Sequence, residues 1–243
     1  MSEYKFPTET VDLPSKGLIY PSDSPLRSGK VEMKYMTAKE EDILTNQAFI
    51  QQGVVLDKLL KALTLDKFNI KTLFPGDKNA LIVASRVLGY GKDYSFTTKD
   101  EDYTVDLSVL ENKTFDESLI TPDGTFKFTL PSSENEVEFK FLTELDEEKI
   151  AQEIEGLQKV NKNSSSEVTT RLKHQIVAIN GSSDKNDIRE FVDTMLLASD
   201  SRALRMYIKD ISPDVNLSTT VEVNGKEEEI DIPINLNFFW PDL

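Results

Sequence analysis

The chain has 243 residues, a formal net charge of −15, no cysteine and a single histidine. This charge opposes binding to duplex nucleic acid or to an anionic membrane, because phosphate contacts need clustered lysine and arginine side chains. The absence of cysteine excludes disulfides and thiolate metal sites, and one histidine excludes a multi-histidine site. With 38% hydrophobic residues, the chain can form a core. We expect a globular protein that binds other proteins and uses neither a metal nor a cofactor.

Targeting and membrane signals are not visible in the sequence. Residues 1–17 lack the basic start and apolar centre of a signal peptide. No apolar run approaches the roughly 20 residues that are needed to cross a bilayer. We therefore expect a cytoplasmic location.

Residues 1–29 are predicted to form an extended N-terminal arm. Their four prolines and two glycines exclude long regular structure. The apolar residues of LPSKGLIYP predict that this stretch lies along a protein surface, because a purely solvated tail has no use for them. A disordered tail is the alternative. The arm supplies three candidate contacts with a partner: Leu13, Leu18 and Tyr20.

Residues 30–142 are predicted to form a helical and antiparallel β domain. The alternation of apolar and charged residues in VEMKY, at 31–35, indicates a half-buried strand. Thr37 and Glu40 have the spacing of a capping box, in which the two side chains satisfy amide donors at a helix start. A helix is therefore expected over about 38–51.

Two more helices follow in this domain. The first carries an apolar stripe after Gly53, formed by Leu56, Leu59, Leu60 and Leu63. The second begins after Pro75-Gly76, where Asp77 is predicted to cap the helix, and it ends at Gly89 or Gly91. Its apolar residues recur at helical spacing: Ala80, Leu81, Ala84, Val87 and Leu88.

Strand-like segments then follow between Tyr94 and Phe141. YSFTT, YTVDLSVL, TFKFTL and VEFKFL alternate apolar and polar residues and are separated by turn residues such as Pro122-Asp123-Gly124. These segments predict one small antiparallel sheet. The acidic residues between them lack the spacing of a calcium loop, so solvated turns explain them better.

Residues 143–243 are predicted to form a helical domain that ends in a hairpin. Thr143 and Asp146 open its first helix. Three helices are expected from their apolar stripes, with a polar loop at 161–167 and a stop at Gly181 after the second. The stripes are Ile150, Ile154, Leu157 and Val160, then Val168, Leu172, Ile176 and Ile179, then Ile188, Phe191, Val192, Met195 and Leu196.

Residues 199–243, the closing unit, carry the clearest signals for where a helix and a turn begin and end. Ser199 or Asp200 can cap a helix that must stop by Ser212, because Pro213 disfavours helical geometry in the residue before it. Asn224-Gly225 then suits the tight turn of a hairpin. An aromatic run ends the unit: Phe238, Phe239 and Trp240.

Two interpretations stay open for the candidate residues of this unit. Arg202 and Arg205 are spaced to grip a partner's carboxylate, or else they pair internally with Asp200 or a nearby Glu. The aromatic run either fills the protein's own core or anchors in a partner's pocket. His174 lies on a helix beside apolar residues with no nucleophile at a defined spacing, which favours a structural or solvated role.

A weak internal repeat relates residues 77–110 to residues 200–234. Each begins with an acidic residue and a helix that carries an Ala-Leu pair, and each continues into a charged hairpin. One helix-plus-hairpin module used twice explains this, and coincidence is the alternative. The predicted fold class is α+β, with helical bundles combined with small antiparallel sheets and hairpins.

Five short blocks together resemble the T4-type bacteriophage baseplate protein family. They occur in the expected order and span nearly the whole chain: LPSKGLIYP at 13–21, MTAKEEDIL at 36–44, FPGDKNALIVASRVLGYG at 74–91, DSRALRMYI at 200–208 and PINLNFFWP at 233–241. In that family the helix-plus-hairpin segments often carry cysteine pairs that look like zinc ribbons. The corresponding stretches here contain no cysteine, which removes any inference of zinc.

The resemblance implies a baseplate hub subunit or hub assembly protein of a contractile tail. Its expected partners are other tail proteins, namely the baseplate hub and the tape measure, and its expected location is the virion baseplate or the host cytoplasm during assembly. We expect no enzymatic activity. The alternative is a tail-associated hydrolase such as a cell-wall degrading hub domain, because carboxylate pairs far apart in sequence escape a motif search. Oligomeric state is left open.

Overall fold

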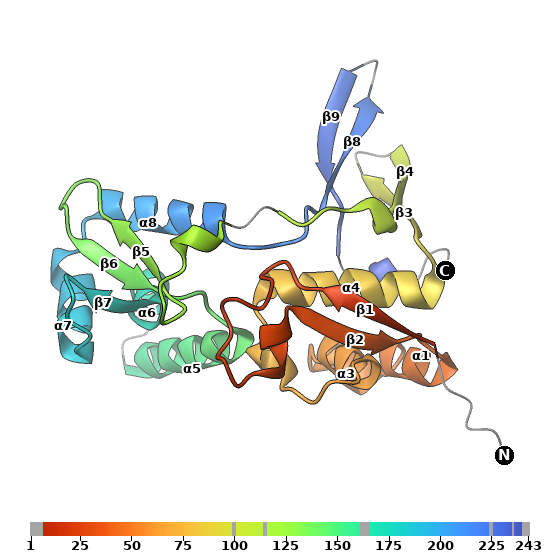
Figure 1. The fold of residues 1–243 in the computed structure, drawn as a ribbon, viewed down its shortest axis with the longest axis horizontal. Helices are drawn as coiled ribbons and strands as arrows, with labels where there is room; N and C mark the ends of the chain where they lie inside the picture. The colour runs from red at the N-terminus through yellow and green to blue at the C-terminus, as the bar shows by residue number, and fades with distance from the viewer. Residues whose placement is uncertain are drawn as a thin grey trace.

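The computed structural model describes residues 7–98, 101–113, 116–160, 166–223, 226–234 and 236–239. The α+β fold class predicted from the sequence is confirmed, with helices accompanied by small antiparallel sheets. The molecule has two lobes joined by crossing connections, with a pair of hairpins standing on one of them (Figure 1). The first lobe contains α1 to α4, and the second contains α5 to α8.

The first lobe begins with two paired strands, continues through four α-helices and ends in a hairpin. Its elements are β1 Thr8–Asp12, a 3-10 turn Pro25–Ser28, β2 Lys30–Lys34, α1 Ala38–Leu44, α2 Gln47–Gln51, α3 Val55–Leu63, a 3-10 turn Ile70–Thr72, α4 Pro75–Tyr90, β3 Asp93–Thr98 and β4 Glu101–Asp106. Helix α4 is buried on most sides and forms the centre of this lobe.

The second lobe repeats this order after a connection that contains two 3-10 turns, Leu107–Val109 and Glu117–Leu119. Its elements are β5 Phe126–Thr129, β6 Glu136–Phe139, α5 Glu144–Val160, α6 Glu167–Gln175, β7 Ile176–Ile179, α7 Lys185–Glu190, a π-helical turn Phe191–Met195 and α8 Ala198–Ile211. The chain then returns to the first lobe, where it forms β8 Ser218–Val223, β9 Lys226–Asp231 and a 3-10 turn Leu236–Phe239.

Within the predicted N-terminal arm, residues 7–29 are part of the folded first lobe. Strand β1 pairs along its whole length with β2 in antiparallel register, from Thr8 opposite Lys34 to Asp12 opposite Lys30. Leu13 is 1% exposed and belongs to the core. The prolines and glycines that exclude a long helix instead shape a tight loop between two strands of the body.

The helices of the first lobe agree with their predicted ends at some positions and differ at others. Glu40 accepts hydrogen bonds from the amide and hydroxyl of Thr37, so the predicted capping box is present. The single helix expected over 38–51 is broken in two, because Asn46 caps a new helix by accepting from the amides of Ala48 and Phe49. Helix α4 ends at Gly91, in agreement with one of the two predicted stops.

The strands predicted between residues 94 and 141 belong to two separate sheets. Strands β3 and β4 form one hairpin, and β5 and β6 join a three-stranded sheet with β7. Strand β7, at 176–179, was expected as the end of a helix, but α6 stops at Gln175. The run IVAI is almost wholly apolar and β-branched, which suits a strand buried on both faces. The domain boundary expected at 142 therefore separates β6 from its partner β7.

The second half of α5 is more exposed than its sequence predicts. Ile150 is 2% exposed, as expected for the buried stripe, but Leu157 is 40% exposed. The helix therefore extends beyond the surface on which its first half packs. Residues 161–165 of the expected polar loop lie outside the described residues.

The two lobes are built on one repeated pattern, which extends well beyond the helix-plus-hairpin module suggested by the sequence. In each lobe a strand, a Leu-Pro-Ser loop and a second strand lead into a capping box, given by Thr37 with Glu40 and by Thr143 with Asp146. A lysine at the end of the second strand, or directly after it, pairs with each capping carboxylate: Lys34 with Glu40 at 2.7 Å, and Lys140 with Asp146 at 3.0 Å.

The strand registers of the two lobes agree residue by residue. Val11 faces Val31 in the first lobe, and Phe128 faces Val137 in the second. These strands precede the two Leu-Pro-Ser loops by the same number of residues, so Val11 and Phe128 are equivalent positions. The later hairpins also agree, since β3, β4, β8 and β9 each have 6 residues and pair without offset. The Asn224-Gly225 turn predicted between β8 and β9 lies outside the described residues.

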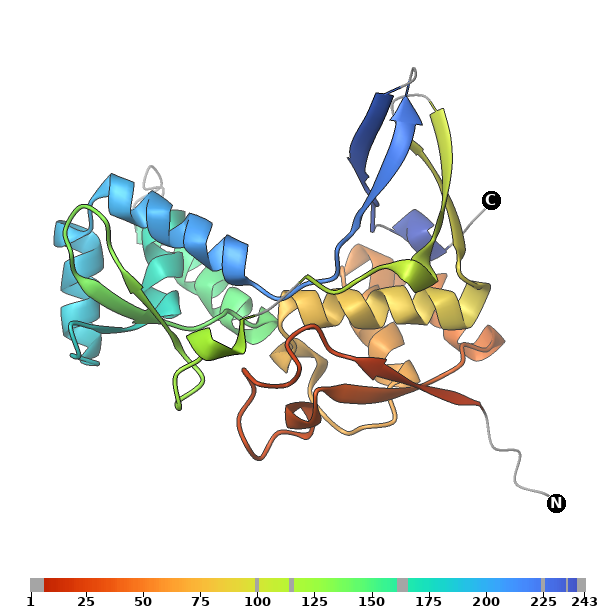
Figure 2. The same ribbon diagram turned by 45° about the horizontal axis from the view of Figure 1, so that its top comes forward.

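The last hairpin does not stand on its own lobe. Both views place β8 and β9 beside β3 and β4, above α4 of the first lobe (Figures 1 and 2). The two connections between the lobes run antiparallel to each other, with Asn112 bridged to Val215 and the amide of Asn216 donating to the carbonyl of Glu111. The second half of the chain therefore completes the structure of the first.

Candidate partner-binding surfaces

Asp77 is a buried carboxylate that ties the N-terminal loop to α4. It accepts hydrogen bonds from the amide of Ser15 at 2.9 Å, from the hydroxyl of Ser15 at 2.6 Å and from Tyr20 Oη at 2.7 Å. Burial raises the pKa of Asp77, and the hydrogen bonds from Ser15 and Tyr20 offset part of this rise. Asp77 was expected to cap its own helix, but Phe74 holds the capping position and the carboxylate points to the loop instead.

Tyr20, a predicted partner contact, is thus committed to the interior. Burial and the adjacent charge of Asp77 raise the pKa of its hydroxyl, which also accepts from the amide of Phe74 at 3.1 Å. Leu13 is buried as well. Of the three residues proposed for the arm, Leu18 alone keeps partial exposure.

Asp200 occupies the equivalent position in the second lobe. Both carboxylates belong to the third residue of their helices, and Asp200 accepts from the amides of Ser132 and Ser133 at 2.8 and 3.0 Å. Burial alone would raise the pKa of Asp200, but hydrogen bonds from Ser133 and Ser132 outweigh it and lower the pKa. The same fold position therefore holds two carboxylates with opposite shifts.

Arg86 anchors the aromatic end of the chain to α4. Its side chain is buried and donates to three main-chain carbonyls, those of Phe238 at 2.9 Å, Gly91 at 2.8 Å and Asp93 at 3.0 Å. The guanidinium also lies over the rings of Tyr90 and Tyr94. Desolvation lowers the pKa of Arg86, which still stays charged in this setting.

The two described residues of the aromatic run, Phe238 and Phe239, fill the protein's own core, as one of the two interpretations predicts. Phe238 and Phe239 are both fully buried, and the Phe238 ring meets Tyr94 edge to face at 4.8 Å. Trp240 lies outside the described residues. A partner therefore has no access to Phe238 or Phe239 in this conformation.

The arginine pair of α8 remains on the surface. Arg202 and Arg205 are both exposed, and Arg205 donates from Nε to the carbonyl of Ser201 at 3.2 Å. Asp200 cannot pair with them, because its carboxylate is turned to Ser132 and Ser133. The pair remains a candidate for binding a partner's carboxylate, since no ion pair engages either arginine in the described part of the chain.

A second candidate surface is an apolar groove between β1 and α4. Its volume is about 390 Å³, and half-buried aliphatic side chains make up much of its wall. The connection after β4 closes the far side. The residues that define this groove, here called the β1–α4 groove, are Glu9, Val11, Ala84, Val87, Leu88 and Leu110.

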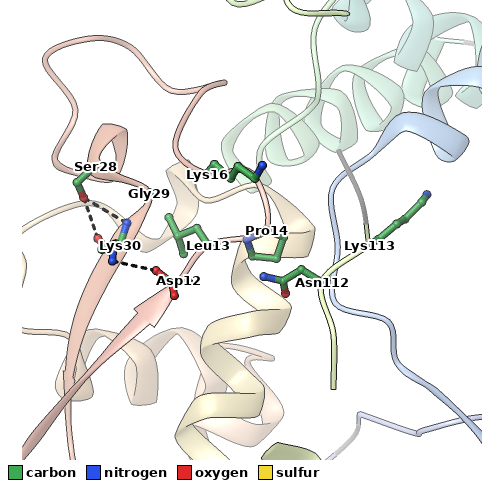
Figure 3. Close-up of a pocket in the computed structure, with 9 residues that line it drawn as sticks. All are labelled: Asp12, Leu13, Pro14, Lys16, Ser28, Gly29, Lys30, Asn112 and Lys113. Atoms are coloured by element: carbon green, nitrogen blue, oxygen red, sulfur yellow. Dashed lines mark hydrogen bonds and ion pairs between the residues drawn. The ribbon is translucent and has the colours of Figure 1, made fainter. Parts of the chain in front are cut away.

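A basic hollow of about 400 Å³ opens beside the end of this groove (Figure 3). Lys16, Lys30 and Lys113 border it, together with Asp12 and Asn112, which also border the groove. Each lysine already has a partner: Lys16 pairs with Glu117, Lys30 with Asp12, and Lys113 donates to the carbonyl of Lys209. Carboxylates thus pair with Lys16 and Lys30, whereas Lys113 bonds a neutral carbonyl and keeps its charge.

Chemical sites are sparse in the described residues. His174 Nε2 lies 2.8 Å from Glu153 Oε2 on the neighbouring helix, which fits the structural role expected for it. Among these residues no group of three or more His, Cys, Asp or Glu side chains could hold a metal ion. A search of the same residues found no helix with the length and apolar character for a membrane span.

Comparison with known proteins gives no match: no family model, no curated protein and no solved structure is similar to this chain.

Sequence reasoning missed the two carboxylate clusters and the groove. A signal for the clusters is present, since Leu-Pro-Ser occurs at 13–15 and again at 130–132, each time ahead of a helix with an early aspartate. The sequence contains no comparable signal for the β1–α4 groove. Its wall is the stripe Ala80, Ala84, Val87 and Leu88 of α4, and an apolar stripe predicts burial whether or not a neighbour covers it.

Proposed function

We propose that this protein is a non-enzymatic component or assembly factor of the central hub of a contractile phage tail baseplate. The observation that carries the proposal is that three of the five blocks behind the family resemblance meet in space. Ser15 and Tyr20 of the first block bind Asp77 of the third. Arg86 of the third block binds Phe238 of the last. Residues far apart in sequence thus form one framework, which supports a resemblance of the whole chain.

The protein acts in this proposal through contacts with other tail proteins, namely the hub and the tape measure. It resides in the virion baseplate or, during assembly, in the host cytoplasm. The exposed arginines of α8 and the β1–α4 groove are the surfaces available for such contacts. The charge of −15 supports protein partners over nucleic acid.

Purified tails and a deletion test the proposal. A fixed copy number of this chain per baseplate identifies a structural subunit. Absence from virions, combined with failed hub assembly after deletion, identifies an assembly factor. Functional tails after deletion would overturn both versions.

A peptidoglycan clearing assay addresses the hydrolase alternative. No arrangement among the described residues favours that alternative, since His174 is paired and the buried Glu40 is engaged in its capping box. We expect no clearing. Clearing that is lost on replacing one buried glutamate would replace the proposed function with an enzymatic one.

A further inference from the structure

The repeated pattern of the two lobes reveals that one groove is filled and its equivalent is open. In the second lobe, Phe128 of β5 stacks on Tyr207 of α8 with ring centroids 4.5 Å apart. These two rings cover the surface between the strand and the helix. Phe126, two residues earlier, is fully buried and stacks on Phe139 at 5.6 Å.

The equivalent positions of the first lobe carry small or polar side chains. Val11 replaces Phe128, as the strand registers require, and Glu9 replaces Phe126. Ala84 replaces Tyr207, because each lies seven residues after the buried aspartate of its helix, Asp77 or Asp200. Val11, Glu9 and Ala84 all border the β1–α4 groove. The open volume therefore lies where the other lobe holds its aromatic pair.

We propose that the β1–α4 groove is a docking site for a segment of a partner protein that presents an aromatic side chain next to a basic one. The volume of about 390 Å³ lies in the range of roughly 300–1,000 Å³ typical of ligand sites. The aliphatic wall of Val87, Leu88 and Leu110 gives a ring the apolar contacts that Phe128 and Tyr207 give each other.

The charge of Glu9 at the rim of the β1–α4 groove favours a basic residue next to the partner's aromatic one. Glu9 is exposed and no ion pair engages it among the described residues, where Tyr35 Oη donates to it at 3.2 Å. Asp12, also at the rim, is already paired with Lys30. A lysine or arginine beside the aromatic residue can therefore form an ion pair with Glu9, in a chain whose net charge is −15. This inference does not depend on the baseplate assignment.

Short peptides test the groove on the intact chain. The probe is N-acetyl-Trp-Arg-amide, titrated against ¹⁵N- and methyl-labelled protein by NMR. We expect saturable shifts at Val11, Val87 and Leu88, with affinity at least about tenfold weaker for N-acetyl-Ala-Arg-amide, which lacks the ring. N-acetyl-Trp-Glu-amide should also bind more weakly, because Glu9 repels it. If N-acetyl-Trp-Arg-amide causes no shift at these residues of the native protein, the proposal is wrong.

Reciprocal exchange of the two lobes' residues provides the matched variants. Val11→Phe with Ala84→Tyr transplants the aromatic pair into the open groove and should abolish the shifts. Phe128→Val with Tyr207→Ala opens the second lobe and should leave the first site intact. Undiminished binding by a folded filled variant contradicts the proposal. Concentration-dependent dimerisation of the native chain that the filled variant loses would also overturn it, since a second copy would then be the occupant.

Discussion

The guanidinium of Arg86 donates a buried hydrogen bond of 2.9 Å to the main-chain carbonyl of Phe238, across a sequence separation of 152 residues. It joins the central helix of the first lobe to the closing segment of the chain. Two further carbonyls, of Gly91 and Asp93, accept hydrogen bonds from Nη1 and Nη2 of the same guanidinium. One side chain thus holds the end of α4, the start of β3 and the last 3-10 turn together.

Replacing Arg86 should destabilise the whole protein. Arg86→Met keeps much of the aliphatic stem but leaves three carbonyls without their donor, and we expect a loss of about 2–4 kcal/mol in the free energy of unfolding. Urea unfolding measures it. Arg202→Met is the matched control, because Arg202 is exposed on a helix and should change stability by less than about 0.5 kcal/mol. Equal effects of the two variants would contradict the role assigned to Arg86.

The equivalent aspartates should give opposite pH dependences. The raised pKa of Asp77 means that the folded state holds its proton more tightly than the unfolded state does. The contribution of Asp77 to the free energy of unfolding is therefore fully present below its unfolded-state pKa of about 3.9. It is lost as pH rises through the folded-state pKa. We expect the stability difference between native and Asp77→Asn protein to shrink as pH rises over that interval, in urea unfolding at several pH values.

Asp200→Asn serves as the contrast. Because its pKa is lowered, Asp200 contributes to the free energy of unfolding above its unfolded-state pKa. This contribution is lost as pH falls through the folded-state pKa. This variant should therefore cost more at neutral pH than in acid. The same direction of pH dependence for both variants would show that the two carboxylates do not differ as described.

Removing the aromatic segment should unfold the first lobe. A variant that ends after Asn237 loses Phe238 and Phe239, both fully buried, and truncation of a buried Phe alone costs about 3–5 kcal/mol. We expect thermal melting to show loss of the cooperative transition or a large fall in Tm. Met206→Ala, at a residue that is 55% exposed, should melt like the native protein. An unchanged Tm on truncation would place these rings outside the core.

Lys78 should couple the two lobes. Its ammonium pairs with Asp57 of α3 and with Glu144 of α5, both at 2.5 Å, so it links the first lobe to the second. A double-mutant cycle with Lys78→Met and Glu144→Gln should give a coupling energy of about 1 kcal/mol. Raising the salt concentration to about 1 M should reduce it. A coupling near zero would mean that the pair of Lys78 with Glu144 does not contribute measurably to holding the two lobes together.

Local signals in the sequence located many elements correctly. The capping box of Thr37 and Glu40, the strand at 31–35 and the helix that ends at Gly91 all depend on neighbouring residues, and the structure has them. The burial of Phe238 was also anticipated as one of two outcomes. These features depend on short-range hydrogen bonding or on plain hydrophobicity.

The failures share a different cause. Ile176 fits a helical stripe, but its strand pairs with Phe139, far away in sequence. Asp77 has the character of a helix cap, yet a distant serine and tyrosine recruit its carboxylate. In each case a partner remote in sequence decided the outcome, and local propensity is a weak prior against tertiary contacts.

The return of β8 and β9 to the first lobe has a consequence for synthesis. Phe238 leaves the ribosome 152 residues after Arg86, so Nε of Arg86 has no Phe238 carbonyl to bond until the entire second lobe has been made. Domains usually fold one after another as they emerge. Here the first lobe can complete its core only after the second lobe has been made. Until then Phe238 is not present to cover Tyr94.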